Sequence, residues 1–180
     1  RLGTNSLLDL LVFGRAAGLH IVDAVKSSTK AHKPLPKDAA DRSLSRLSRL
    51  DNSVSGEYAQ DVANDIRKSM QQHAGVFRTQ SSLDEGVSKI AAIAERVKSI
   101  QLKDKSQIFN TARIEALEVE NLIECASATI VSAAARRESR GAHTVDDYAD
   151  SPQYPNGRND AEWMKHTLWY SEGNRLDYKP

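Results

Sequence analysis

The sequence contains a single cysteine, Cys125, and no apolar run long enough to cross a bilayer. One cysteine excludes an intramolecular disulfide framework and is typical of a reducing compartment. A transmembrane helix requires about 20 consecutive apolar residues, and the first residues also lack the pattern of a signal peptide. The sequence therefore predicts neither a disulfide scaffold nor a membrane span.

The positive and negative charges of the chain are also nearly balanced. The chain has 25 Lys and Arg residues against 24 Asp and Glu residues, which gives a formal net charge of +1. No run of five like charges occurs. Because a nucleic-acid-binding surface needs a basic footprint, we expect no nucleic-acid partner.

Metal-ligand spacing is absent as well. No two histidines are four residues apart, as a helical metal site requires, and Cys125 has no second cysteine at zinc-finger spacing. We therefore predict no metal site, and we predict that the histidines are polar surface groups or tertiary hydrogen-bonding groups. Cys125 falls on the apolar side of a predicted helix, so we expect a buried structural thiol. The five histidines are His20, His32, His73, His143 and His166.

Helical periodicity dominates what is present. Apolar residues recur every three or four positions in three stretches, residues 55–73, 82–101 and 107–137. Three such helices with short connections predict an antiparallel three-helix bundle, preceded by a short helix within residues 38–50. We find no run of five alternating residues typical of a strand. The predicted fold class is therefore mainly α.

The N-terminal region predicts a helix of a different kind. Residues 7–13 are nearly all apolar and follow Ser6, which can cap a helix, so the pattern predicts a helix over residues 6–25. Residues 26–37 are rich in Lys, Ser and Pro, which is typical of a linker. A helix that is apolar on most sides must be covered on most sides. Since the chain also begins without methionine, we expect it to be a segment of a larger protein.

The C-terminal region changes character after a charged run over residues 136–143. We predict that this run closes the long helix, with Gly141 as the residue just past its end. The tail that follows is rich in Asp, Asn, Pro and Gly and predicts irregular structure. Its large aromatic residues are expected to pin the tail against a neighbour; they are Trp163, Trp169, Tyr170 and Tyr178.

The sharpest candidate site lies at the start of the chain. Arg1 stands five residues before Ser6, which opens the apolar helix. A guanidinium can bind a carboxylate by paired hydrogen bonds, and the N–H groups of a helix N-terminus can hold an electron-rich group. The combination indicates a carboxylate site beside a site for an electron-rich ring.

Several strings of residues, in order along the chain, resemble the succinate dehydrogenase and fumarate reductase flavoprotein family. The first two resemble the end of its flavin domain, the next two its C-terminal helical domain, and the last three its C-terminal signature. The resemblance covers essentially all 180 residues. The strings are RLGTNSLLDL at 1–10, VFGRAAG at 12–18, FNTARIEALE at 109–118, ENL at 120–122, ESRGAH at 138–143, DY at 147–148 and WMKHT at 163–167.

The resemblance implies a role for three residues. Arg1 matches the arginine that grips a succinate carboxylate, and Ser6 and Leu7 match residues that contact the flavin of FAD. The family moves hydride from succinate to the flavin, while another arginine takes the second proton. That arginine, the histidine that carries the flavin and the dinucleotide-binding glycines lie upstream in the family. The resemblance therefore places no catalytic residue in this chain, and we expect the segment alone to be inactive.

The resemblance also implies domains and partners. Residues 1–37 would be the end of the FAD-binding domain and a linker, residues 38–137 the C-terminal helical bundle, and residues 138–180 an irregular tail that docks on the flavoprotein or a partner subunit. The expected partners are succinate or fumarate, an iron–sulfur subunit and membrane-anchor subunits of a respiratory complex of the tricarboxylic acid cycle. The expected location is the cytoplasmic face of a bacterial inner membrane, or the matrix face of the mitochondrial one.

Other hypotheses remain open at this point. Fumarate reductase and L-aspartate oxidase belong to the same superfamily. The run over residues 136–143 favours the respiratory enzymes, and residues 118–122 weakly favour the dehydrogenase over the reductase. A helical interaction module without chemistry fits the periodicity equally well, but it leaves the apolar residues 7–13 and the order of the strings unexplained.

Overall fold

The computed structural model describes residues 5–28 and 34–180. The chain divides into two compact units, residues 1–40 and residues 41–180. The first unit contains α1 (Asn5–Ser27), so the predicted helix over residues 6–25 is confirmed. Its apolar side chains are exposed; Leu10, Leu11 and Phe13 are 67–70% exposed.

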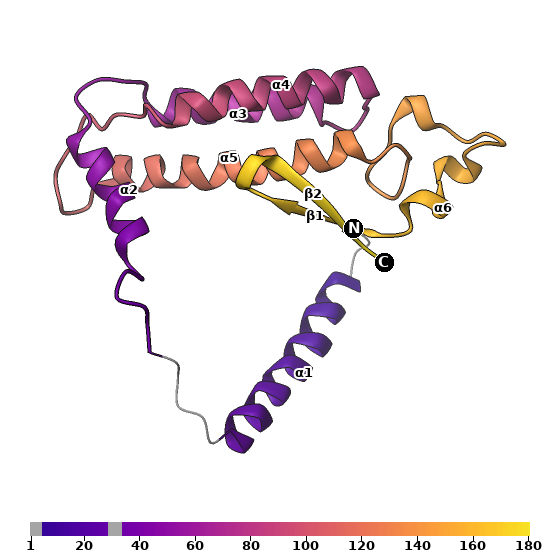
Figure 1. The fold of residues 1–180 in the computed structure, drawn as a ribbon, viewed down its shortest axis with the longest axis horizontal. Coiled ribbons are helices and arrows are strands. Elements are labelled where there is room, and N and C mark those ends of the chain that lie inside the picture. Colours follow the sequence, from indigo (N-terminus) through magenta and orange to yellow (C-terminus); the bar gives the residue numbers. More distant parts are fainter. Residues whose placement is uncertain (1–4, 29–33) are drawn as a thin grey trace. The chain divides into compact units, whose positions relative to one another are not determined.

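The second unit is built on the predicted bundle, which is confirmed (Figure 1). It begins with α2 (Asp41–Asn52). Then α3 (Ala59–His73), α4 (Gln80–Val97) and α5 (Thr111–Ala135) pack against one another, running in alternating directions. Capping residues set the starts of two of these helices. Thr79 accepts a hydrogen bond from the Ser82 amide at the start of α4, and Asn110 accepts one from the Arg113 amide at the start of α5.

The core lies between the bundle helices and extends to both of its ends. The three helices contribute fully buried Val62 and Ile66, Leu83 and Ile90, and Ile130. Leu50 of α2 and Ile100 close one end, and Val145 closes the other; each is at most 1% exposed. Cys125 is exposed, so the prediction of a buried thiol is wrong. The thiol sits beside the buried row of α5 formed by Val119, Ile123 and Ala126, not within it.

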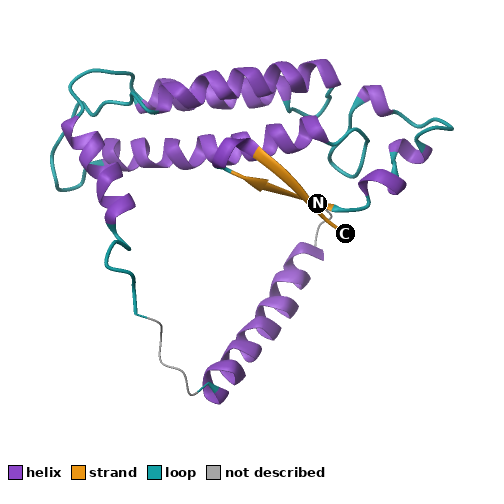
Figure 2. Ribbon diagram, in the orientation of Figure 1, coloured by secondary structure: helices purple, strands orange, loops and turns teal. Residues whose placement is uncertain are grey.

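The tail contains short helices and a hairpin (Figure 2). Three single-turn 3₁₀ helices span Asp146–Tyr148, Pro155–Gly157 and Glu172–Asn174, and α6 spans Asp160–Trp163. Strands β1 (His166–Tyr170) and β2 (Arg175–Lys179) pair antiparallel, with Thr167 opposite Tyr178, and β1 contacts α5. These strands were not predicted from the sequence. Each has only five residues with two half-buried positions, and in β1 one of the two is Thr167, so apolar alternation is weak.

Gly141 is not the residue after the long helix, so that prediction is wrong. Helix α5 ends at Ala135, and Arg136 is already extended. Gly141 has a φ of 59° in a tight turn, where the Arg140 amide donates to the His143 carbonyl and the His143 amide donates back. The left-handed conformation suits glycine because it carries no Cβ. Within residues 5–28 and 34–180, no helix is both long enough and apolar enough to cross a membrane.

Close approach of the three bundle helices depends on Gly86. A Cβ at this position would lie 2.6 Å from the His73 Cβ and 2.9 Å from the Ile130 Cδ1. The isoleucine tip can rotate away, whereas the His73 Cβ is fixed to the backbone of α3. A side chain at position 86 would therefore push α4 away from α3.

We predict that Gly86→Ala lowers the free energy of unfolding of the second unit by about 1–3 kcal/mol, the usual effect of overpacking a core. This loss outweighs the helix propensity that alanine gains, which is up to about 1 kcal/mol. Urea denaturation followed by circular dichroism measures the change. Gly14→Ala is the control, because a Cβ there would meet no heavy atom within 4 Å other than those of its chain neighbours and its own helix backbone. A Gly86→Ala protein as stable as the parent would contradict the tight contact.

Candidate functional site

Of the predicted site residues, Arg1 lies outside the described residues. Ser6 and Leu7 lie in the first turn of α1, where Ser6 is partly exposed and Leu7 is 66% exposed. The first N–H groups of a helix have no partner within it, and the first turn of α1 contains no acidic residue. This donor set fits the acceptor atoms of an electron-rich ring, as a flavin requires.

A second cluster of polar residues centres on the buried carboxylate of Glu138, which is 0% exposed. Its Oε1 accepts hydrogen bonds from the Arg136 Nη1 and the Arg140 Nε, both at 2.7 Å. Its Oε2 accepts from the Arg140 Nη2 at 3.0 Å and from the Asn159 amide at 2.9 Å. Burial raises the pKa of Glu138, but the hydrogen bonds from Arg140, Asn159 and Arg136 outweigh it and lower the pKa to about 2.

The guanidinium of Arg136 connects this carboxylate to the tail. Its Nη1 also donates to the Trp163 carbonyl at 2.9 Å, and its Nη2 donates to the Lys165 carbonyl at 2.7 Å and the Thr167 Oγ1 at 3.1 Å. The guanidinium carbon lies 5.3 Å from the centre of the Trp163 ring. Because Arg136 directly follows α5, it fixes the start of β1 beside the end of that helix.

Arg140 extends the network to α6. It forms an ion pair with Asp160 in addition to the pair with Glu138. The hydrogen bonds to Glu138 and Asp160 raise the pKa of Arg140 above its ordinary value. Both arginines that contact Glu138 are therefore held by neighbours on both sides.

His143 joins the network to the loop between α3 and α4. Its Nε2 lies 2.9 Å from the Arg136 carbonyl, and its Nδ1 lies 3.0 Å from the Arg78 Nη1. Since a carbonyl only accepts and a guanidinium only donates, the neutral ring must carry its proton on Nε2. Burial and the charges of Arg78 and Arg136 lower the pKa of His143, although the bond to the carbonyl opposes them. His143 is therefore a neutral bridge at pH 7.

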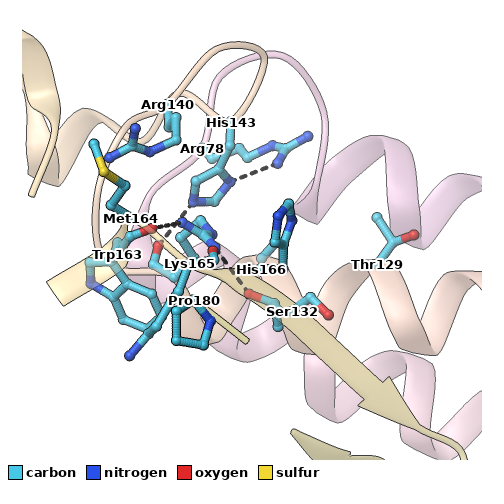
Figure 3. A pocket seen from close by; sticks show the side chains of 13 residues that line it. Arg78, Thr129, Ser132, Arg140, His143, Trp163, Met164, Lys165, His166 and Pro180 are labelled. Carbon is cyan, nitrogen blue, oxygen red and sulfur yellow. Dashed lines mark hydrogen bonds between the residues drawn. The ribbon is translucent and has the colours of Figure 1, made fainter. Parts of the chain in front are cut away.

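These residues border a groove of about 860 Å³, which we call the Arg78 groove (Figure 3). Its walls come from α5, from the α3–α4 loop and from residues 163–167. Basic groups and imidazoles line it, and no Asp or Glu side chain does; these groups are Arg78, Arg136, Arg140, Lys165, His143 and His166. Such a lining can bind an anionic group. In the described part of the chain, no set of three or more His, Cys, Asp or Glu residues could hold a metal ion.

The sequence pattern gave the run over residues 136–143 only the role of closing the long helix, and it gave Glu138 no partner. The run of arginines around one glutamate was the available signal for Glu138. Arg78 and the Asn159 amide were missed, because they are 65 and 21 residues away from their partners in the sequence. The predicted hydrogen-bonding role of the histidines holds for His143.

Comparison with known proteins gives consistent matches. A family model described as "Fumarate reductase flavoprotein C-term" matches residues 63–180. The succinate dehydrogenase flavoprotein subunit of Rickettsia bellii is 45% identical over 183 residues, and the match covers 100% of this chain and 29% of that protein. The mitochondrial succinate dehydrogenase flavoprotein subunit of Oryza sativa is 40% identical over 182 residues, with 100% and 28% covered. The chain thus spans less than a third of these relatives.

Solved structures agree with these matches. An Escherichia coli quinol fumarate reductase FrdA structure superposes with a TM-score of 0.85 at 31% identity, covering 99% of this chain and 30% of that chain. The Mycobacterium smegmatis Sdh1 complex gives a TM-score of 0.75 at 29% identity, covering 82% of this chain and 25% of that chain.

We predict that Glu138→Gln lowers the free energy of unfolding of the second unit by about 3 kcal/mol at pH 7, because two partly buried arginines lose the charge of a fully buried carboxylate. The pH dependence follows from the lowered pKa of Glu138. Its stabilising contribution is complete above the ordinary value of 4.5 and is lost as the pH falls towards about 2. Urea denaturation across this pH range measures both effects.

The matched control is Glu95→Gln, which removes an exposed ion pair with Lys98. It should change the unfolding free energy by less than about 1 kcal/mol. A Glu138→Gln protein with the stability and acid profile of the parent would show that the buried carboxylate does not hold the tail.

Proposed function

The chain belongs to the succinate dehydrogenase and fumarate reductase flavoprotein family, as a C-terminal segment, and we propose that its parent is the flavoprotein subunit of a succinate dehydrogenase. This enzyme would oxidise succinate to fumarate. The identity of up to 45% over the whole chain with succinate dehydrogenase flavoprotein subunits carries the proposal. A fumarate reductase flavoprotein subunit from Haemophilus influenzae is less similar, at 32%.

We assign substrate binding to Arg1 and cofactor binding to Ser6 and Leu7. The Arg1 guanidinium would hold one carboxylate of succinate through two parallel hydrogen bonds. FAD, when bound to the complete protein, supplies the hydride acceptor. The amides at Ser6 and Leu7 would face its electron-rich edge and stabilise negative charge there by about 0.3–2 kcal/mol, as helix N-termini do. No residue of this chain is proposed as the catalytic acid or base.

The remaining residues would support assembly. Residues 1–37 would close the FAD-binding domain, residues 38–137 would form the helical domain, and residues 138–180 would dock on the flavoprotein or on a partner. The proposed partners are an iron–sulfur subunit and membrane-anchor subunits, which pass electrons to a quinone. The complex would lie peripherally at the cytoplasmic face of a bacterial inner membrane or at the mitochondrial matrix face. The names of solved relatives as Sdh1 and quinol–fumarate reductase complexes support this assembly.

Fumarate reductase is the second candidate. The TM-score of 0.85 to quinol fumarate reductase favours it, since the succinate dehydrogenase structure named above reaches 0.75. Succinate oxidation and fumarate reduction by the complete complex, measured with the same quinone couple, distinguish the two: faster oxidation supports the dehydrogenase.

We predict that the isolated 180-residue chain neither oxidises succinate nor binds flavin stoichiometrically, because only Arg1, Ser6 and Leu7 of the proposed site are in it. Dye reduction with succinate and the flavin absorbance of the purified chain test this. Flavin that copurifies in a one-to-one ratio would refute it.

In the complete enzyme, we predict that Arg1→Lys lowers kcat/KM for succinate about 100-fold or more with little loss of flavin. Lysine keeps the charge but replaces the planar fork with a point charge on a flexible stem. The lost charge-assisted hydrogen bonds and the misplaced substrate together account for about 3 kcal/mol. Steady-state kinetics and flavin content are the measurements.

Arg67→Lys, at an exposed position on α3, is the matched control and should keep the parent kcat/KM. An Arg1→Lys enzyme with normal kcat/KM, or one that loses flavin first, would show that Arg1 does not clamp the substrate.

A further inference from the structure

The Arg78 groove carries positive charge that the acidic side chains of the described residues neutralise only in part. Four Lys and Arg residues line it, and no Asp or Glu side chain does. Two of them, Arg136 and Arg140, are compensated from behind by Glu138. The other two, Arg78 and Lys165, form no ion pair in the described part of the chain.

Arg78 is held in a fixed orientation by neutral groups. Its Nε donates to the Gly75 carbonyl at 2.8 Å, its Nη2 to the Ala74 carbonyl at 3.1 Å, and its Nη1 to the His143 Nδ1 at 3.0 Å. Each terminal nitrogen of a guanidinium has two N–H groups, so each keeps one donor for another acceptor. The result is a half-buried, pre-oriented cation whose counter-charge is missing.

Lys165 is positioned by aromatic rings. Its Nζ lies 4.2 Å from the centre of the Tyr178 ring and 5.0 Å from that of Trp163. Rings orient an ammonium group but leave its three N–H donors unused. Lys165 and Arg78 come from the tail and from the α3–α4 loop, and Figure 3 shows both on the wall of the groove.

The surroundings favour carboxylates over phosphate. The groove is lined by the C-terminal half of α5, at Thr129, Ser132 and Ala133, and a helix C-terminus carries partial negative charge. This partial charge opposes a phosphate dianion more strongly than it opposes a singly charged carboxylate. Apolar surface from Trp163, Met164 and Pro180 completes the lining and suits intervening side chains.

We propose that the Arg78 groove is a docking site for an acidic, extended peptide segment of a partner protein, with Arg78 and Lys165 each binding one of its carboxylates. The segment alternates acidic side chains, which reach the two cations, with apolar ones, which pack on the groove wall. Peptide docking can be tested independently of the proposed succinate dehydrogenase function, because the experiment measures peptide binding by this chain and not succinate turnover.

The probe is a short blocked peptide of alternating glutamate and valine, labelled with a fluorophore, and the measurement is fluorescence anisotropy with the full 180-residue chain. We expect saturable binding that weakens about tenfold in Arg78→Gln and in Lys165→Gln, the factor that about 1.4 kcal/mol represents. Circular dichroism checks that Arg78→Gln folds. Lys165→Gln provides the same test without altering the α3–α4 loop.

Lys103→Gln is the matched control, since Lys103 also lies over a tyrosine ring, 5.2 Å from the centre of Tyr58, but outside the groove. It should bind the probe as the parent does. Absence of binding, equal binding of a glutamine–valine peptide, displacement by inorganic phosphate, or self-association of the chain through the groove would each overturn the proposal. Loss of binding in Lys103→Gln equal to that in Lys165→Gln would also overturn it, because it would show an unspecific charge effect.

Discussion

The bonds of one buried carboxylate, Glu138, hold the C-terminal tail, residues 138–180, against the end of α5. Burying a carboxylate is unfavourable unless charge and hydrogen bonds replace its hydration. Here two guanidinium groups and one backbone amide do so, and their donors come from the end of α5, from a tight turn and from the approach to α6. Because Arg136 also binds the carbonyls that lead into β1, the position of the hairpin depends on the same carboxylate.

The helices could be predicted from the sequence because their apolar rows have a clear period. Residues such as Val62 and Ile66, four apart on α3, are both buried. The helix boundaries were less accurate, since caps such as Thr79 and Asn110 act through single hydrogen bonds that a pattern of apolar residues does not contain. Exposed Cys125 lies one position before buried Ala126, and one position along a helix changes the direction of the side chain by about 100°.

For the candidate sites, the sequence provided only short motifs and their order along the chain, and no geometry. The order of motifs indicated the family, and the comparisons confirm that assignment. The geometry around Glu138 could not be derived in the same way. The Asn159 amide reaches Glu138, and Arg78 reaches His143, from distant parts of the chain. The proposed roles of Arg1, Ser6 and Leu7 stay proposals, since they depend on the resemblance and not on contacts within the described residues.

The short hairpin has a consequence for the stability of the tail. A two-stranded ribbon of five-residue strands is at most marginally stable alone in water, so β1 and β2 need the end of α5 as a support. The contacts that provide it, from Arg136 to Lys165 and Thr167, span 29 and 31 residues of sequence. Closing loops of that length is entropically unfavourable before the helix that anchors them has formed. The hairpin therefore depends on the folded end of α5 for its order, and a change that frays that end of the helix should release β1 and β2 as well.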